Sequence, residues 1–225
     1  MELELPDRGS DPIDPTRTVG ARDGTPLQNG DRIMDSATEY ERRALDFLRV
    51  RDASSIGDRV VRQWARKLPP RSEVVEIACG GGYPITRALS ESGLQLWAID
   101  SSSTLLAAFE RRFPHVPTRC ERVQESTLFD RTFDAAVAIG LLFLLPEVEQ
   151  CQLIRRTSDH LKPGGRFLFT APIETGRWED LNTGTPCHSL GLERYQRRLQ
   201  ESGLRIIATM EDAGENHYFE TEKPA

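Results

Sequence analysis

The chain has 225 residues, of which 38% are hydrophobic and 28% charged, and this composition predicts a globular protein with one sizeable core. A formal net charge of −6, from 29 basic and 35 acidic residues, argues against nucleic acid as the main partner. The four cysteines are too far apart to form a close zinc-binding pair, so no metal is expected, and reduced thiols fit a cytoplasmic protein. No apolar stretch reaches the roughly 20 residues of a membrane helix, and the acidic first residues do not resemble a signal peptide, so no membrane partner is expected.

The first part of the chain is expected to differ in character from the rest. Residues 1–35 are predicted to be a mobile tail, because they are rich in proline and glycine and contain few large apolar side chains. Residues 36–225 are expected to form a single domain. Helical periodicity begins near Tyr40 and continues in a second pattern over 56–68. These helices, within residues 36–69, are expected to act as a lid over the site.

From residue 70 onward, short apolar runs alternate with helical patterns. Strands are predicted over residues 74–78, 94–99, 117–123, 133–139, 166–171, 204–210 and 217–220. Helices are predicted over residues 84–89, 104–113, 148–161 and 192–202. Such alternation is typical of right-handed crossovers and a mostly parallel sheet with helices on both faces. The last two strands are too close in sequence for a parallel crossover, so the prediction is an α/β, Rossmann-like sheet of seven strands with an antiparallel C-terminal strand.

A glycine-rich loop and an aspartate occupy the positions where this type of sheet binds ligands. Glycines 80–82 follow the first predicted strand, where they let the backbone approach a ligand closely. Asp100 ends the second strand, and a carboxylate at this position can accept both ribose hydroxyls of a nucleoside. Each feature also has a structural explanation: the glycines as a tight turn, and Asp100 as an N-cap of the next helix, a role open equally to Ser102 or Ser103.

The loop favours a nucleoside without a pyrophosphate. The dinucleotide pattern Gly-x-Gly-x-x-Gly is broken, because Ile85 stands where its third glycine would be. A phosphate-binding Gly-x-x-x-x-Gly-Lys-Ser/Thr run is also absent from the sequence. A nucleoside cofactor without phosphates therefore fits better.

Four segments together carry a family resemblance: residues 74–82, Asp100, residues 133–140 and residues 161–166. In order and spacing they resemble the motifs of class I S-adenosylmethionine-dependent methyltransferases, over about residues 70–172. The resemblance implies S-adenosyl-L-methionine as the cofactor. One departure is that Ala78 replaces the first glycine of the usual acidic-x-Gly-x-Gly-x-Gly pattern. Because alanine is the smallest substitute, cofactor binding is expected to survive this change.

The resemblance also implies roles for the residues that follow the first two strands. Asp100 would accept the ribose hydroxyls, and Ser101 would flank the adenine. The side chain of Glu76 would hold the methionine end of the cofactor. The backbone of the glycine-rich loop would also hold it, at Ala78, Cys79, Gly80 and Gly82.

Further positions come from the loops after the third and fourth strands. By the same resemblance, the adenine edge would meet Gln124, Glu125 and Ser126. Gly140 and Leu141 would lie beneath the sulfonium and the incoming nucleophile.

The acceptor is expected to be a small molecule, methylated on oxygen or nitrogen. After the fourth strand the run Leu141-Leu142-Phe143-Leu144-Leu145 stands where nucleic-acid amino-methyltransferases carry a polar Asn/Asp-Pro-Pro-Tyr/Phe motif. Candidates for the substrate pocket are the following aromatic and histidine side chains: Tyr40, Trp178, His188, His217 and Tyr218. His188 and His217 are also candidate general bases, because the usual pKa of histidine is near neutrality, although a structural or surface role is the more common one for such a histidine.

Two other functions stay open from the sequence. The first is an oxidoreductase that uses a dinucleotide, against which the broken glycine pattern counts. The second is a non-catalytic subunit with a methyltransferase-like fold that only binds the cofactor or a partner.

Overall fold

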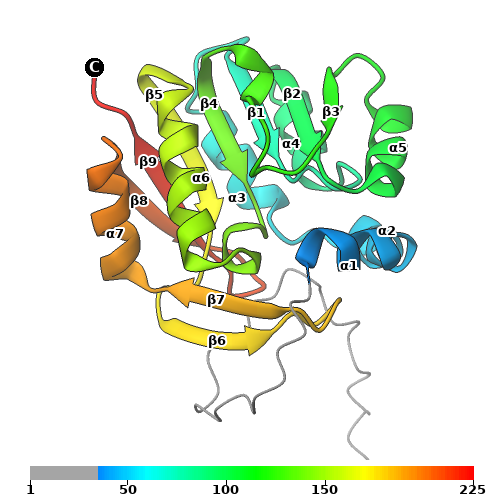
Figure 1. Cartoon of the computed structure of the whole chain (residues 1–225). Coiled ribbons are helices and arrows are strands. Elements are labelled where there is room, and N and C mark those ends of the chain that lie inside the picture. Colours follow the sequence, from blue (N-terminus) through cyan, green and yellow to red (C-terminus); the bar gives the residue numbers. More distant parts are fainter. Residues whose placement is uncertain (1–34) are drawn as a thin grey trace, which may run out of the picture.

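The structure is a computed structural model, and it describes residues 35–225. Its centre is a seven-stranded sheet with the strand order β3-β2-β1-β4-β5-β9-β8 (Figure 1). The strands are β1 (Glu73–Ile77), β2 (Gln95–Asp100), β3 (Thr118–Cys120), β4 (Phe133–Ala138), β5 (Leu161–Thr170), β8 (Arg205–Glu211) and β9 (His217–Glu222). Strands β1 to β5 are mutually parallel, and β9 pairs antiparallel with both β5 and β8. The predicted fold class, including the antiparallel C-terminal strand, is confirmed.

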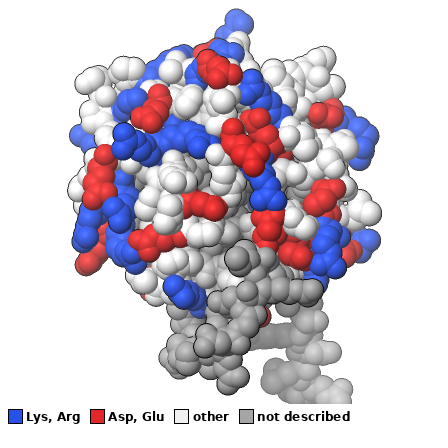
Figure 2. All heavy atoms as spheres, in the orientation of Figure 1, with Lys and Arg blue, Asp and Glu red and all other residues white. Residues whose placement is uncertain are grey.

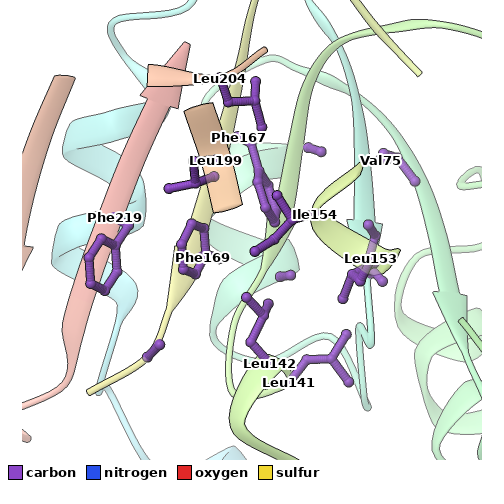
Figure 3. Packing of buried hydrophobic residues seen from close by; sticks show 14 of the residues in the cluster. Val75, Leu141, Leu142, Leu153, Ile154, Phe167, Phe169, Leu199, Leu204 and Phe219 are labelled. Atoms are coloured by element: carbon purple, nitrogen blue, oxygen red, sulfur yellow. The ribbon is translucent and has the colours of Figure 1, made fainter. Parts of the chain in front are cut away.

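Helices cover both faces of the sheet because the strands are apolar on both sides. The helices of the sheet layers are α3 (Asp58–Ala65), α4 (Ile85–Glu91), α5 (Ser103–Arg112), α6 (Glu147–Asp159) and α7 (Leu192–Glu201). One face packs against α6 and α7, where Ile154 and Leu199 are fully buried (Figure 3). On this face the rings of Phe169 and Phe219 stack across β5 and β9, with centroids 4.9 Å apart. On the other face, α3 and α4 pack around the fully buried indole of Trp64.

The N-terminal helices lie beyond the carboxyl ends of the parallel strands (Figure 1). They are α1 (Ser36–Arg42) and α2 (Ala44–Ala53). Asp35 caps α1 by accepting a hydrogen bond from the backbone N–H of Thr38 at 3.3 Å. The continuous helical pattern predicted around Tyr40 is interrupted at Arg43, which lies between the two helices. Apart from Asp35, the predicted mobile tail lies outside the described residues.

A two-stranded antiparallel hairpin between β5 and α7 was not predicted from the sequence. It consists of β6 (Thr175–Glu179) and β7 (Pro186–Leu190), and it runs across the same end of the molecule as α1 (Figure 1). Its strand β6 alternates between exposed and half-buried residues and includes Gly176, so it lacks the apolar run that marked the other strands. Within residues 35–225, no helix is both long and apolar enough to cross a membrane.

Candidate functional site

A cavity lies between the carboxyl ends of β1, β2 and β4 on one side and the helices α1 and α2 on the other. The space between its lining residues is about 1060 Å³ when the open solvent at its mouth is included. Ten of the sequence-predicted site residues line it: Tyr40, Glu76, Ala78, Cys79, Gly80, Asp100, Ser101, Gln124, Gly140 and Leu141. The cavity is therefore at the end of the sheet where this class of fold binds its ligands.

The glycine-rich loop after β1 has three residues with positive φ. The φ angle is 61° at Ala78, 55° at Gly80 and 89° at Gly82. The conformation of Ala78 is one that glycine adopts freely and alanine adopts at a cost, which explains why a glycine is usual at this position. A Cβ at Gly82 would overlap the ring of Phe113, so Gly82 packs against the residue that follows α5 and does not line the cavity.

Asp100 lies at the cavity wall, where both of its carboxylate oxygens accept backbone hydrogen bonds. Oδ2 accepts from the N–H of Gly80 at 2.7 Å, and Oδ1 accepts from the N–H of Ser102 at 2.8 Å. Burial raises the pKa of Asp100, and these two N–H groups act in the opposite direction. The N-cap of α5 is Ser102, whose hydroxyl accepts from the N–H of Leu105 at 3.1 Å. Asp100 is therefore free of the capping role and holds the glycine-rich loop against the end of β2.

A buried acidic side chain and a buried basic side chain line another part of the cavity. Glu76 is 3% exposed, and its Oε2 accepts a hydrogen bond from the Thr86 hydroxyl at 2.7 Å. Burial raises the pKa of Glu76 to about 8. The guanidinium of Arg51, 5% exposed, also lines the cavity, and its positive charge opposes this rise. A zwitterionic amino-acid group, with its ammonium near Glu76 and its carboxylate near Arg51, would match this pair of charges.

The loop after β3 contributes residues that the sequence-based assignment placed slightly too late. Gln124 lines the cavity, but Glu125 and Ser126 do not. Instead the cavity wall includes Glu121, whose Oε1 is buried and has no hydrogen-bond partner among the described residues. A buried, unpartnered carboxylate oxygen is costly, and a donor on a bound ligand would satisfy it. Its position directly after β3 was the signal in the sequence that could have identified it.

The far wall of the cavity is mostly apolar. After β4, Leu141, Leu144 and Leu145 line it, together with Gly140. The N–H of Gly140 donates to the Thr170 hydroxyl at 2.7 Å, which fixes the start of this loop to β5. Three of the five residues of the Leu/Phe run therefore form pocket wall, while Leu142 is part of the core.

Tyr40 of α1 extends this wall toward the β6–β7 hairpin. Its side chain lines the cavity and interacts with Asp180 and Asn182 in the hairpin turn. Burial, followed by the nearby negative charge of Asp180, raises the pKa of the Tyr40 phenol well above its usual value. Tyr40 is therefore a neutral hydrogen-bonding group at any physiological pH.

The four other candidate substrate residues lie outside the cavity lining. Tyr218 is 1% exposed, and its hydroxyl donates to Asp212 at 2.7 Å, so it is part of the core. Trp178 packs against Phe143 with ring centroids 5.6 Å apart. His217 lies on β9, with its Nε2 3.6 Å from an oxygen of Glu211.

His188, the second candidate base, lies on β7 and also does not line the cavity. Burial, and to a smaller extent Arg177, lowers the pKa of its imidazole. Within residues 35–225, no cluster of three or more His, Cys, Asp or Glu side chains could hold a metal ion.

The comparisons with known proteins agree with this geometry. Residues 74–165 match a family described as a methyltransferase domain. This segment is therefore similar to a methyltransferase domain. The match begins in β1 and ends in β5, so it contains every strand end that faces the cavity. No curated protein matches the chain in sequence.

Solved methyltransferase structures share the fold across most of the chain. The glycopeptide N-methyltransferase MtfA is 21% identical over 75% of this chain and 96% of its own, with a TM-score of 0.63. CalS10, an amino pentose methyltransferase from Micromonospora echinaspora, is 15% identical over 74% and 89%, with a TM-score of 0.59. An S-adenosylmethionine-dependent methyltransferase from Clostridium acetobutylicum is 14% identical over 86% and 94%, also with a TM-score of 0.59.

Proposed function

We propose that this methyltransferase transfers the methyl group of S-adenosylmethionine to a nitrogen or oxygen atom of a small-molecule acceptor. The observation that carries the proposal is the meeting of Asp100, Glu76 and the glycine-rich loop around one cavity, within the segment that matches the methyltransferase family. Two of the fold neighbours are named for amine-bearing acceptors, a glycopeptide and an amino pentose, and this supports nitrogen as the accepting atom.

Different groups of cavity residues match the ribose, the adenine and the methionine end of the cofactor. Asp100 would accept the ribose hydroxyls with the oxygen lone pairs that its two backbone donors leave free. The unpartnered Oε1 of Glu121 would accept from the adenine amino group, with Gln124 beside it. Glu76 and Arg51 would hold the ammonium and the carboxylate of the methionine end. Each end of the cofactor therefore meets a group of complementary charge or hydrogen-bonding capacity.

The bound cofactor supplies a methyl group already activated by its sulfonium. The chain has to orient the acceptor in line with that group and keep water out. Leu141, Leu144 and Leu145 provide an apolar wall for this purpose, and Tyr40 provides a neutral hydrogen-bonding group above it. Such a wall favours an amine acceptor in its neutral, nucleophilic form, since burial disfavours the ammonium. Because His188 and His217 do not line the cavity, we propose that neither acts as a base and that the proton is lost to solvent after transfer.

Transfer of radiolabelled methyl groups from S-adenosylmethionine to a panel of small amines and hydroxyl compounds tests this function. Turnover on amines, with loss of activity in Asp100→Ala, is the expected result. Cofactor binding with no turnover on either class would favour the non-catalytic binding subunit. Binding of NAD in place of S-adenosylhomocysteine would favour the oxidoreductase.

A further inference from the structure

Glu41, near the end of α1, makes an unusual set of contacts with the start of α5. Its carboxylate accepts hydrogen bonds from three consecutive residues about sixty positions away in the sequence. Thr104 donates from its hydroxyl at 2.7 Å and from its N–H at 3.2 Å, the Ser103 hydroxyl donates at 3.1 Å, and the Ser102 hydroxyl also donates. These bonds, that of Ser102 first, lower the pKa of Glu41, so it is ionised near neutral pH.

The same turn holds the carboxylate of Asp100. Ser102 is fully buried, and its N–H donates to Asp100 Oδ1 at 2.8 Å while its hydroxyl donates to Glu41. Asp100 in turn accepts from the N–H of Gly80. A continuous path of hydrogen bonds therefore runs from α1, through the start of α5, to the ribose-binding position and the glycine-rich loop.

The contacts of Glu41 matter for α1 because this helix has little else to hold it. No residue of α1, Ser36–Arg42, is buried as a whole, and only the phenol end of Tyr40 is enclosed, at the β6–β7 turn. Its other anchors are the ion pair between Asp35 and Arg122 and the contact of Tyr40 with the β6–β7 turn. A segment with few buried apolar groups opens readily, so polar contacts decide how long it stays closed. Ser36, Ala37 and Tyr40 line the cavity, so α1 closes the site only while it is docked.

We propose that Glu41 is a positioning residue that couples closure of α1 to the orientation of Asp100. The inference rests on the proposed function, because it takes Asp100 as the ribose acceptor. With Glu41 in place, the Ser102 N–H holds Asp100 in the orientation that faces the ribose, and α1 stays over the bound cofactor. Without it, the cofactor loses part of its ribose contact and dissociates faster.

The test compares S-adenosylhomocysteine with its 2′-deoxy analogue on the full chain. For Glu41→Ala we expect at least about a tenfold rise in the dissociation rate of S-adenosylhomocysteine, measured by surface plasmon resonance. We also expect the affinity advantage of S-adenosylhomocysteine over the deoxy analogue to shrink, because Asp100 is no longer held toward the ribose. Glu41→Gln keeps one acceptor oxygen and should give an intermediate result, and it serves as the test if the alanine variant does not fold.

Asp46→Asn is the matched control. Asp46 lies on α2, its side chain is 74% exposed, and it pairs with Arg49 of the same helix, so its loss should change neither rate nor discrimination. If both Glu41 variants keep the wild-type dissociation rate and discrimination, the coupling does not exist. A loss of thermal stability with unchanged discrimination would assign Glu41 a purely structural role and also overturn the proposal. Failure of the wild-type chain to bind S-adenosylhomocysteine would instead contradict the proposed function itself.

Discussion

Asp100 has two roles in the site. It accepts hydrogen bonds from the backbone of Gly80 and of Ser102, and it lines the cavity. Asp100→Ala should weaken S-adenosylhomocysteine binding by about 1.5–4 kcal/mol, roughly tenfold to several hundredfold, through loss of charge-assisted hydrogen bonds. It should also lower the melting temperature, because the N–H groups of Gly80 and Ser102 lose their acceptor. Asp100→Asn should be almost as harmful, since its amide would turn a donor toward one of these N–H groups. Titration calorimetry and thermal melts measure both effects, and a lowered melting point with unchanged affinity would contradict the ribose assignment.

Glu76 should make folding stability and cofactor binding depend on pH. Its pKa in the folded protein is about 8, against 4.5 for the exposed group, so between these values the folded state keeps a proton that the unfolded state has lost. The free energy of unfolding contributed by this group is therefore largest below about pH 4.5 and falls as pH rises toward 8. Glu76→Gln should remove this part of the pH dependence, as measured by denaturant unfolding at pH 5 to 8.

Ligand binding offers a second readout of Glu76. The ammonium of S-adenosylhomocysteine would favour the ionised carboxylate, so binding at pH 7 should release up to about one proton. Calorimetry in buffers of different ionisation enthalpy detects this release, and Glu76→Gln should abolish it. Proton uptake, or no proton exchange in the wild type, would argue against the placement of the ammonium beside Glu76.

Ala78 is a site of backbone strain that a single substitution relieves. Its left-handed φ of 61° costs roughly 1–2 kcal/mol for an L-residue, and glycine avoids this cost. Because glycine is more flexible in the unfolded chain, about 0.5–1 kcal/mol of that gain is lost again. Ala78→Gly should therefore stabilise the protein by up to about 1 kcal/mol in urea unfolding, with cofactor affinity retained. Destabilisation by the same amount would mean that the alanine methyl group makes a packing contact that outweighs the strain.

Sequence patterns predicted the position of residues that directly follow a strand, and predicted less well the position of residues that depend on tertiary contacts. The glycine-rich loop and Asp100 lie at fixed positions after strands, so their place at the cavity followed from the pattern. Glu121 and Arg51 could not be assigned in the same way, because their role depends on the path of a loop and on the docking of α2. Tyr218 and His217 are polar residues near a strand end. Core residues and site residues both occur in this pattern, so the sequence could not tell which of the two they are.

At the scale of elements, α2 packs directly on the glycine-rich loop. A Cβ at Gly81 would overlap Leu48 Cδ2 of α2, and Arg112 joins the two segments by donating to Gly81 O and to Asp52, each at 2.8 Å. Gly81→Ala should destabilise the protein by about 1–3 kcal/mol through overpacking. In a Leu48→Ala background the same change should cost much less, because the space is vacant. A double-mutant cycle from urea unfolding measures this coupling, and additive effects would show that α2 does not rest on the loop.

The elements that sequence patterns did not reveal are stabilised by specific hydrogen bonds and tertiary contacts, and they lack a continuous apolar face. Strand β6 of the hairpin is half-exposed, and the hairpin turn is fixed by Thr183, which donates to Asp180 from both its N–H and its hydroxyl. The break between α1 and α2 at Arg43 leaves no mark on the hydrophobic periodicity. The buried strands and the two-sided helical layers, in contrast, follow from continuous apolar runs and amphipathic patterns.

At the scale of the whole molecule, the surface carries both signs of charge. On the face shown in Figure 2, Lys and Arg side chains alternate with Asp and Glu, so this face has no continuous basic band of the kind that binds a nucleic-acid backbone. The fold follows from local patterns because all successive parallel strands except β3 and β4 are joined by an α-helix, and the right-handed crossover rule leaves few topologies. The position of the cavity then follows from the sheet, and the cover made by α1 and α2 follows from tertiary contacts.

Cofactor binding is the central claim, and a calorimetric titration of the full chain with S-adenosylhomocysteine tests it most directly. The account predicts saturable binding at one site per chain, a tenfold or greater loss of affinity in Asp100→Ala, and no competing binding of NAD. Absence of binding to the folded wild-type protein, or equal binding by wild type and Asp100→Ala, would contradict it.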